Sequence, residues 1–205
     1  MGEPASFCYS EGDMSILSPL FKWWVNAWPH RTHIRRQVPR FLRSCPEPFR
    51  GEVLELGAGR GDTSQKILET FPQVELTAID IDPDSAAYFS GLQHKYGRRL
   101  KVRQANMFQL PFDRDAFDIV IGINVFPHVK PFSLRKAIEE SLRVLRPGGL
   151  LGISDKALMK PSHNITRDAI AEILEQEDCE ILHSSGSSRY ELWARKPYPV
   201  PPPQG

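Results

Sequence analysis

The chain has 205 residues, a formal net charge of +1, and 25% charged and 40% hydrophobic residues. This length and composition fit one globular domain with a sizeable core, and the balanced charge argues against a dedicated nucleic-acid binder. No apolar run reaches the roughly 18 residues that cross a bilayer. Three scattered cysteines, Cys8, Cys45 and Cys179, argue against a disulfide framework or a cysteine zinc site. The first residues also lack a secretory signal, so we expect a reducing, cytoplasmic location.

Residues 1–50 are predicted to form a helical extension without a strand of its own. The segment SILSPLFKWWVNAW holds three tryptophans, and HRTHIRRQVPRFLR holds five arginines and no acid. Pro46 and Pro48 end this part. We expect the extension to pack on the domain that follows and to act as its lid.

Residues 51–196 alternate strand-like and helix-like segments. The strands are predicted, from apolar runs, at 53–56, 74–79, 100–104, 117–123 and 150–154. The helices are predicted from a Thr63 or Ser64 cap to Phe71, and at about 83–97, 134–145 and 166–177. Two last strands, at 179–185 and 188–196, form a hairpin around Gly186. This order predicts an α/β fold with a Rossmann-like, doubly wound, seven-stranded sheet, mostly parallel with a C-terminal antiparallel hairpin.

Residues 197–205, PYPVPPPQG, are too rich in proline for a helix or a central strand. We expect the folded part to end near Lys196 and to be followed by an extended, solvated tail.

The segment ELGAGRGDT follows the first strand and opens a helix. Its glycines allow positive φ and close approach of a ligand, and the helix N-terminus offers free N–H donors. Asp80 ends the next strand, where a carboxylate accepts both hydroxyls of a ribose. The loop therefore fits either a dinucleotide or S-adenosylmethionine (SAM).

Two acidic residues favour SAM. The dinucleotide pattern is G-x-G-x-x-G, whereas this chain has alternating glycines followed by Asp62. An acid at the helix entrance repels a pyrophosphate but attracts the ammonium of an amino-acid moiety. Glu55, two residues before the first glycine, would also repel a phosphate and therefore also favours SAM.

These segments resemble the class I SAM-dependent methyltransferases, in particular the small-molecule group related to the quinone and sterol methyltransferases. The resemblance covers about residues 50–195. VLELGAGRGDTS is similar to that family's first motif and AIDIDP to its second, while QANMFQLPF, FDIVIGINVFPHV and LRPGGLLGIS are similar to later segments.

The resemblance implies that the chain binds SAM and releases S-adenosylhomocysteine. It places Asp80 on the ribose, Ile81 and Met107 beside the adenine, and Asn106 where an aspartate commonly contacts the adenine amino group. The expected cofactor-binding residues are Glu55, Gly57, Ala58, Gly59, Gly61, Asp62, Thr63, Asp80, Ile81, Asn106, Met107, Asn124 and Phe126.

His128 is the candidate general base, because it follows the fourth strand and a histidine side chain in general titrates near neutrality. The alternative is that it caps or orients this loop. Asn124 begins N-V-F-P, which differs from the [N/D/S]-P-P-[Y/F] stretch of methyltransferases that act on base amines or glutamine. No paired metal-ligand carboxylates follow the strands, and we interpret Asp155 as a helix or loop cap.

The acceptor is expected to bind Trp23, Trp24, Tyr9 and His128, although the tryptophans could equally anchor the extension to the sheet. The arginines at 31, 35, 36, 40 and 43 suit an anionic substrate, a phospholipid surface or simply a solvated helix face.

The leading hypothesis is a SAM-dependent methyltransferase with a small-molecule acceptor, apolar or amphiphilic. The alternatives are an RNA or protein methyltransferase that uses the basic arm, a non-catalytic SAM-binding scaffold with a proline tail, and a nicotinamide-dependent enzyme.

Overall fold

In the computed structural model the described residues are 37–156, 165–187 and 189–199. The predicted acceptor residues Tyr9, Trp23 and Trp24 and the arginines before residue 37 lie outside these ranges.

A seven-stranded sheet forms the centre of the molecule, with the strand order β3-β2-β1-β4-β5-β7-β6. The neighbours from β3 to β5 are parallel, and β7 is antiparallel to both β5 and β6. The predicted fold class is therefore confirmed. The strands are β1 (Gly51–Leu56), β2 (Val74–Asp80), β3 (Leu100–Gln104), β4 (Phe117–Ile123), β5 (Leu145–Lys156), β6 (Glu180–Ser185) and β7 (Arg189–Arg195).

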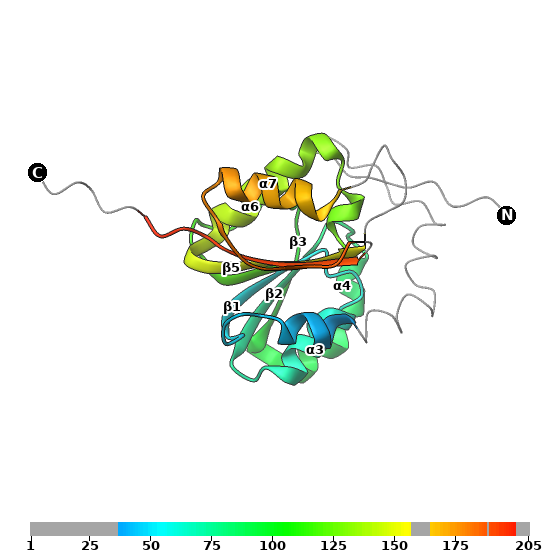
Figure 1. The fold of residues 1–205 in the computed structure, drawn as a ribbon. Helices are drawn as coiled ribbons and strands as arrows, with labels where there is room; N and C mark the ends of the chain where they lie inside the picture. Colours follow the sequence, from blue (N-terminus) through cyan, green and yellow to red (C-terminus); the bar gives the residue numbers. More distant parts are fainter. Residues whose placement is uncertain (1–36, 157–164, 188, 200–205) are drawn as a thin grey trace, which may run out of the picture.

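Helices cover both faces of the sheet, as a doubly wound fold requires. In Figure 1, α6 and α7 lie over one face and α3 and α4 over the other. The helices are α3 (Asp62–Thr70), α4 (Ser85–Tyr88), α5 (Ser90–Tyr96), α6 (Leu134–Val144) and α7 (Arg167–Gln176), with short 3₁₀ turns η1 (Gly97–Arg99), η2 (Phe126–His128) and η3 (Pro131–Ser133).

The two faces of the sheet carry separate hydrophobic cores, because side chains alternate along each strand. On β5, Leu151 and Ile153 belong to the core under α6 and α7, whereas Leu150 belongs to the core on the other face. Trp193 of β7 is fully buried in the second core.

The described part of the N-terminal extension, a helix at residues 37–43, packs on this second face. The ring of Phe41 stacks on Trp193 with centroids 4.7 Å apart and an interplanar angle of 8°. Trp193 Nε1 also donates to Ser44 Oγ at 3.1 Å. These contacts fix the helix against the part of β7 where Trp193 pairs with Gly152 of β5.

Three predicted element boundaries are wrong. The helix expected at 83–97 is broken into α4, α5 and η1, and the junction between α4 and α5 is Phe89, which is completely buried. Helix α3 is not capped by Thr63 or Ser64: it begins at Asp62 after Gly61, and the Ser64 hydroxyl donates to Glu55 instead. Strand β5 begins at Leu145, five residues early, with an irregular register between Phe117 and Ile119 of β4.

Backbone pairing reaches Lys196, the predicted end of the folded part. The backbone of Lys196 pairs with Gly148 and Gly149, at 3.0 and 2.9 Å. Tyr198 lies over Gly148, where an added Cβ would come within 2.3 Å of its ring. The first residues of the predicted tail therefore contact the sheet.

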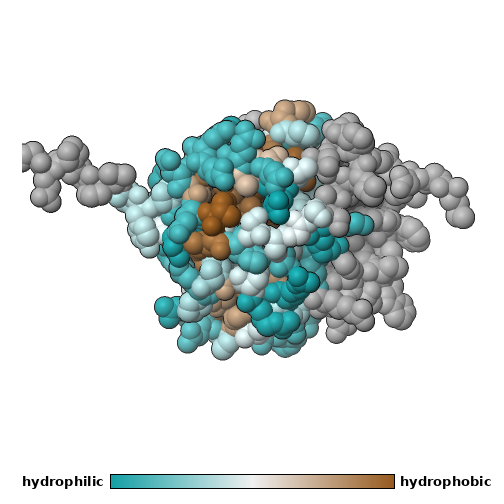
Figure 2. All heavy atoms as spheres, in the orientation of Figure 1, coloured by the Kyte–Doolittle hydropathy of each residue, from teal (hydrophilic) through white to brown (hydrophobic). Residues whose placement is uncertain are grey.

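The molecular face drawn in Figure 2 is mostly hydrophilic, with the most hydrophobic residues gathered left of centre and smaller hydrophobic patches at the top and near the bottom. Among the described residues the exposed large hydrophobic side chains are Tyr88, Phe132 and Tyr198. None of the helices in the described ranges combines the length and apolar character that a membrane crossing requires.

Candidate functional site

Four loops with polar side chains meet at the carboxyl edge of the parallel strands. They follow β1 (residues 57–61), β2 (81–84), β3 (105–110) and β4 (124–128). The chain connections reverse direction between β1 and β4, and doubly wound sheets bind ligands outside the strand ends at such a point. All thirteen expected cofactor-binding residues lie on or beside these loops.

The loop after β1 turns sharply because its three glycines are left-handed, with φ of 61° at Gly57, 53° at Gly59 and 80° at Gly61. An added Cβ at Gly57 would come within 2.7 Å of Val125, so this position also needs the missing side chain. At Gly59 such a Cβ would meet nothing within 4 Å. Gly59 is therefore required for its backbone conformation and leaves open space beside it.

Asp80 ties this glycine loop to the end of β2. Its Oδ2 accepts the N–H of Gly59 at 2.7 Å, and its Oδ1 accepts the N–H of Asp82 at 2.9 Å. Burial raises the pKa of Asp80, while the backbone N–H groups of Asp82, Gly59 and Ile81 oppose that rise. A carboxylate has about four lone-pair sites, so acceptor capacity is left for ligand hydroxyls.

Glu55 lies beneath the loop rather than at its surface. Its side chain is 3% exposed and accepts a hydrogen bond from the Ser64 hydroxyl. Burial raises the pKa of Glu55 to about 8, with the charge of Asp80 adding to the rise. At pH 7 the carboxyl is mostly protonated, so the negative charge expected here from the sequence is weakened. Asp62, in the first turn of α3, is therefore the acidic residue that better supports a ligand with an ammonium group.

Asn106 and Met107 follow β3 next to the end of β2. The Ala105 N–H donates to the Asp80 carbonyl at 2.9 Å, which holds this segment in place. The Asn106 Oδ1 accepts the Phe108 N–H at 3.0 Å, and Met107 packs against the core. The predicted adenine contacts therefore come together, although their roles stay predictions.

The loop after β4 is held by Asp155 at the end of β5. Asn124 is left-handed with φ 57°, and the Val125 N–H donates to Asp155 Oδ1 at 2.9 Å. Asp155 is fully buried, its Oδ2 has no hydrogen-bond partner in the described part of the chain, and burial raises its pKa to about 7. The interpretation of Asp155 as a loop cap is confirmed.

The same loop carries two other predicted site residues. Phe126 is completely buried in the core, which favours a packing role, while His128 is half-buried.

One polar cluster at this edge was missed by the sequence reasoning. Gln37 Nε2 donates to Ser154 Oγ at 2.7 Å, and Asn124 Nδ2 approaches Gln37 Oε1 at 3.4 Å. The Arg189 guanidinium donates to the same Gln37 oxygen. These residues are up to 152 positions apart in the chain, so no local pattern could have joined them.

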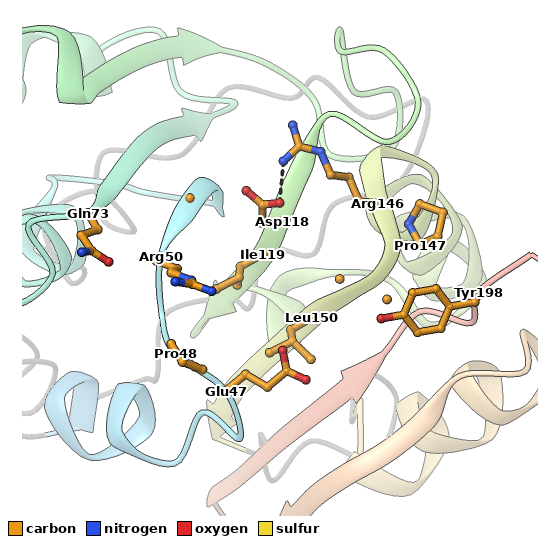
Figure 3. A pocket seen from close by; sticks show the side chains of 13 residues that line it. Glu47, Pro48, Arg50, Gln73, Asp118, Ile119, Arg146, Pro147, Leu150 and Tyr198 are labelled. Atoms are coloured by element: carbon orange, nitrogen blue, oxygen red, sulfur yellow. Dashed lines mark hydrogen bonds and ion pairs between the residues drawn. The ribbon is translucent and has the colours of Figure 1, made fainter.

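A separate cavity of about 530 Å³ lies at the opposite, amino edge of the sheet. Figure 3 shows Arg50 and Tyr198 reaching toward it from two sides, with Arg146 paired to Asp118. It is lined by the start of β1, the start of β4 and the 147–150 segment, and so lies a strand length away from the glycine loop. The residues covered by the structure hold no group of three potential metal ligands.

Comparisons with known proteins agree with this geometry. Residues 53–149 match the family model described as methyltransferase domain. The ubiquinone/menaquinone biosynthesis C-methyltransferase of Bartonella henselae is 32% identical over 112 residues, which are 52% of this chain and 41% of that protein. A probable phthiotriol/phenolphthiotriol dimycocerosates methyltransferase of Mycobacterium ulcerans is 30% identical over 50% of this chain and 38% of that protein.

The solved structure of Burkholderia thailandensis 1,6-didemethyltoxoflavin-N1-methyltransferase, with bound S-adenosylhomocysteine, superposes with a TM-score of 0.66 at 22% identity. It covers 83% of this chain and 80% of that one, and this likeness shows the fold. The chain spans less than half the length of the two curated relatives.

Proposed function

Because the chain contains a class I SAM-dependent methyltransferase domain, we propose that it binds SAM at the carboxyl edge of its sheet and transfers the methyl group to a small-molecule acceptor. The observation that carries this proposal is the Asp80 carboxylate bound to the Gly59 N–H at 2.7 Å. This hydrogen bond joins the glycine loop to the end of β2, the two motifs on which SAM recognition depends. It places the Asp80 carboxylate beside Gly59, where the space for a side chain is open.

Different residues of the carboxyl edge bind different parts of SAM. Asp80 accepts from ribose hydroxyls, and Ile81, Asn106 and Met107 border the adenine. Glycines 57, 59 and 61 let the amino-acid part approach the backbone, and Asp62 attracts its ammonium group. When the cofactor is bound, its sulfonium supplies an activated methyl group. The protein's main contribution is then to position the acceptor in line with that group.

His128 serves as the proton acceptor where the attacking atom carries a proton. Its loop is fixed at Val125 by Asp155, and its backbone N–H donates to the Val125 carbonyl at 3.1 Å. The alternative role is structural, in which His128 only orients this loop. Replacing His128 by Ala separates the two: turnover is lost with SAM binding kept if it is the base, and turnover persists if it is structural.

A small, apolar or amphiphilic acceptor is favoured by the balanced net charge and by the quinone and lipid methyltransferase names of the two curated relatives. The test is incubation of the purified chain with methyl-labelled SAM and a metabolite extract, followed by identification of the labelled product. Transfer of label to a small molecule supports the proposal. Label only in RNA or protein, or binding of S-adenosylhomocysteine without any transfer, contradicts it.

A further inference from the structure

Arg189 is a charged group at the carboxyl edge to which the proposed function gives no role. It begins β7, beside Lys156 at the end of β5, and so shares the edge with the loop after β4. Its side chain is half-buried, and burial lowers the pKa of its guanidinium, with Asp155 and Glu191 opposing. Arginine nonetheless stays protonated at neutral pH.

Within residues 37–156, 165–187 and 189–199, no carboxylate forms an ion pair with the guanidinium, although Asp155 and Glu191 act on it at longer range. Of its five N–H donors the structure shows one engaged, and the acceptor is the neutral amide oxygen of Gln37. A half-buried positive charge without a partner is unfavourable, and proteins generally pair such charges.

The two nearest acidic groups are engaged elsewhere. Glu191 lies 3.8 Å from Arg40 Nε on the helix at residues 37–43. Asp155 belongs to the other face of β5, since strand side chains alternate, and its Oδ1 accepts the Val125 N–H. Ser154, which faces the same side as Gln37, binds Gln37 instead.

The position of Arg189 fits the acceptor side of the site. The glycine loop and Asp80 lie over β1 and β2, and this is where the cofactor is proposed to bind. The edge over β5 and β7, beyond the β4 loop that carries the expected cofactor residues Asn124 and Phe126, is left for the second substrate. There, Gln37, Asn124, Ser154 and Arg189 form a connected set of polar groups, the Gln37 cluster.

We propose that Arg189, held by the buried pair of Gln37 and Ser154, binds an anionic group of the methyl acceptor, so that the acceptor is a carboxylate-bearing amphiphile. Guanidinium pairs with carboxylate through two parallel hydrogen bonds. Within the part of the chain that the structure describes, Gln37 takes one of the five N–H donors of Arg189. The inference rests on the proposed function, because it assigns the acceptor half of the same edge.

The test compares hexanoate with hexanamide, which share size and apolar chain but differ in charge. Binding of each is followed by NMR on protein saturated with S-adenosylhomocysteine. The Asn124 side-chain amide is the probe in every variant, and the Arg189 Nε–H is a second probe in wild-type protein. Wild-type protein is expected to bind hexanoate at least about tenfold more tightly, equal to about 1.4 kcal/mol.

Three variants test whether Arg189 causes the preference for hexanoate over hexanamide. Arg189→Gln is expected to abolish the preference for hexanoate, and Arg189→Lys to keep most of it. Arg195→Gln is the matched control, because Arg195 lies at the far end of the same strand and pairs with Glu47 and Glu180. Melting temperature and affinity for S-adenosylhomocysteine show that each variant is folded.

The outcomes separate this inference from the proposed function. Equal affinity for the two probes in wild-type protein, or an unchanged preference in Arg189→Gln, overturns the assignment of Arg189. Failure of wild-type protein to bind S-adenosylhomocysteine overturns the proposed function instead.

Discussion

Replacement of Asp80 by Asn removes a charge while preserving shape. The carboxylate now accepts two backbone N–H groups, from Gly59 at 2.7 Å and Asp82 at 2.9 Å. An amide has a single oxygen, so one of these N–H groups loses its acceptor. The ribose hydroxyls of a bound cofactor lose a charged acceptor as well.

The expected magnitude follows from these contacts. A hydrogen bond to a charged group contributes about 1.5–3 kcal/mol. Loss of one such bond in the complex corresponds to an increase of about 10- to 150-fold in the dissociation constant of S-adenosylhomocysteine. Loosening of the glycine loop acts in the same direction.

Isothermal titration calorimetry at pH 7.5 measures this change, with circular dichroism to verify the fold. Glu75→Gln is the matched control, because Glu75 is exposed on the same strand and its nearest charged partner is Lys101 at 3.5 Å. The control is expected to leave the affinity within about twofold, since exposed pairs contribute at most about 1 kcal/mol. Equal affinities for Asp80→Asn, the control and wild-type protein would refute the assignment of the ribose to Asp80.

Three further perturbations probe burial, backbone conformation and packing. Glu55 has a folded pKa of about 8 against 4.5 in the unfolded chain, so the folded state holds a proton that the unfolded state releases. The free energy of unfolding should therefore fall between pH 4.5 and 8, by at most about 1.4 kcal/mol per pH unit, and Glu55→Gln should flatten this slope; an unchanged slope in denaturant titrations contradicts the burial argument. Gly59→Ala should destabilise the protein by about 1–2 kcal/mol because φ is 53°, whereas Gly91→Ala, in helix α5 with free space around it, should stabilise it by about 0.5–1 kcal/mol. The reverse order of the two melting temperatures would show that the loop does not need its left-handed conformation. Phe41→Ala removes the ring stacked on Trp193 and should lower the free energy of unfolding by about 3–5 kcal/mol. A loss below about 1 kcal/mol would mean that the helix at residues 37–43 is not part of the folded core.

The parts of the fold that could be predicted are those encoded by local patterns. The apolar run of β4 and the alternation of strands and helices depend on neighbouring residues only, and so does the glycine loop. The break at Phe89 could not be predicted, because no proline marks it in the local sequence. The Ser64 hydroxyl suits a helix cap by sequence, yet it bonds to Glu55 because the fold buries that acid beneath α3.

The candidate site also has parts that the sequence predicts and parts that it does not. The loops that carry the expected cofactor residues come together as the strand order requires, because parallel strands end at one edge. The Gln37 cluster joins the extension, β5 and β7, and only tertiary packing creates it. The protonation of Glu55 likewise follows from burial, which residue type alone does not reveal.

The central claim is that SAM binds at the glycine loop and Asp80. An amide NMR titration with SAM, run beside one with NADH, tests it most directly, because Gly57, Gly59 and Gly61 report on the carboxyl edge and Gly148 and Gly149 on the cavity at the amino edge. We predict saturable shifts at the first three glycines with SAM, none at the other two, and no response to NADH. Shifts at the glycine loop with NADH but not with SAM would contradict the claim.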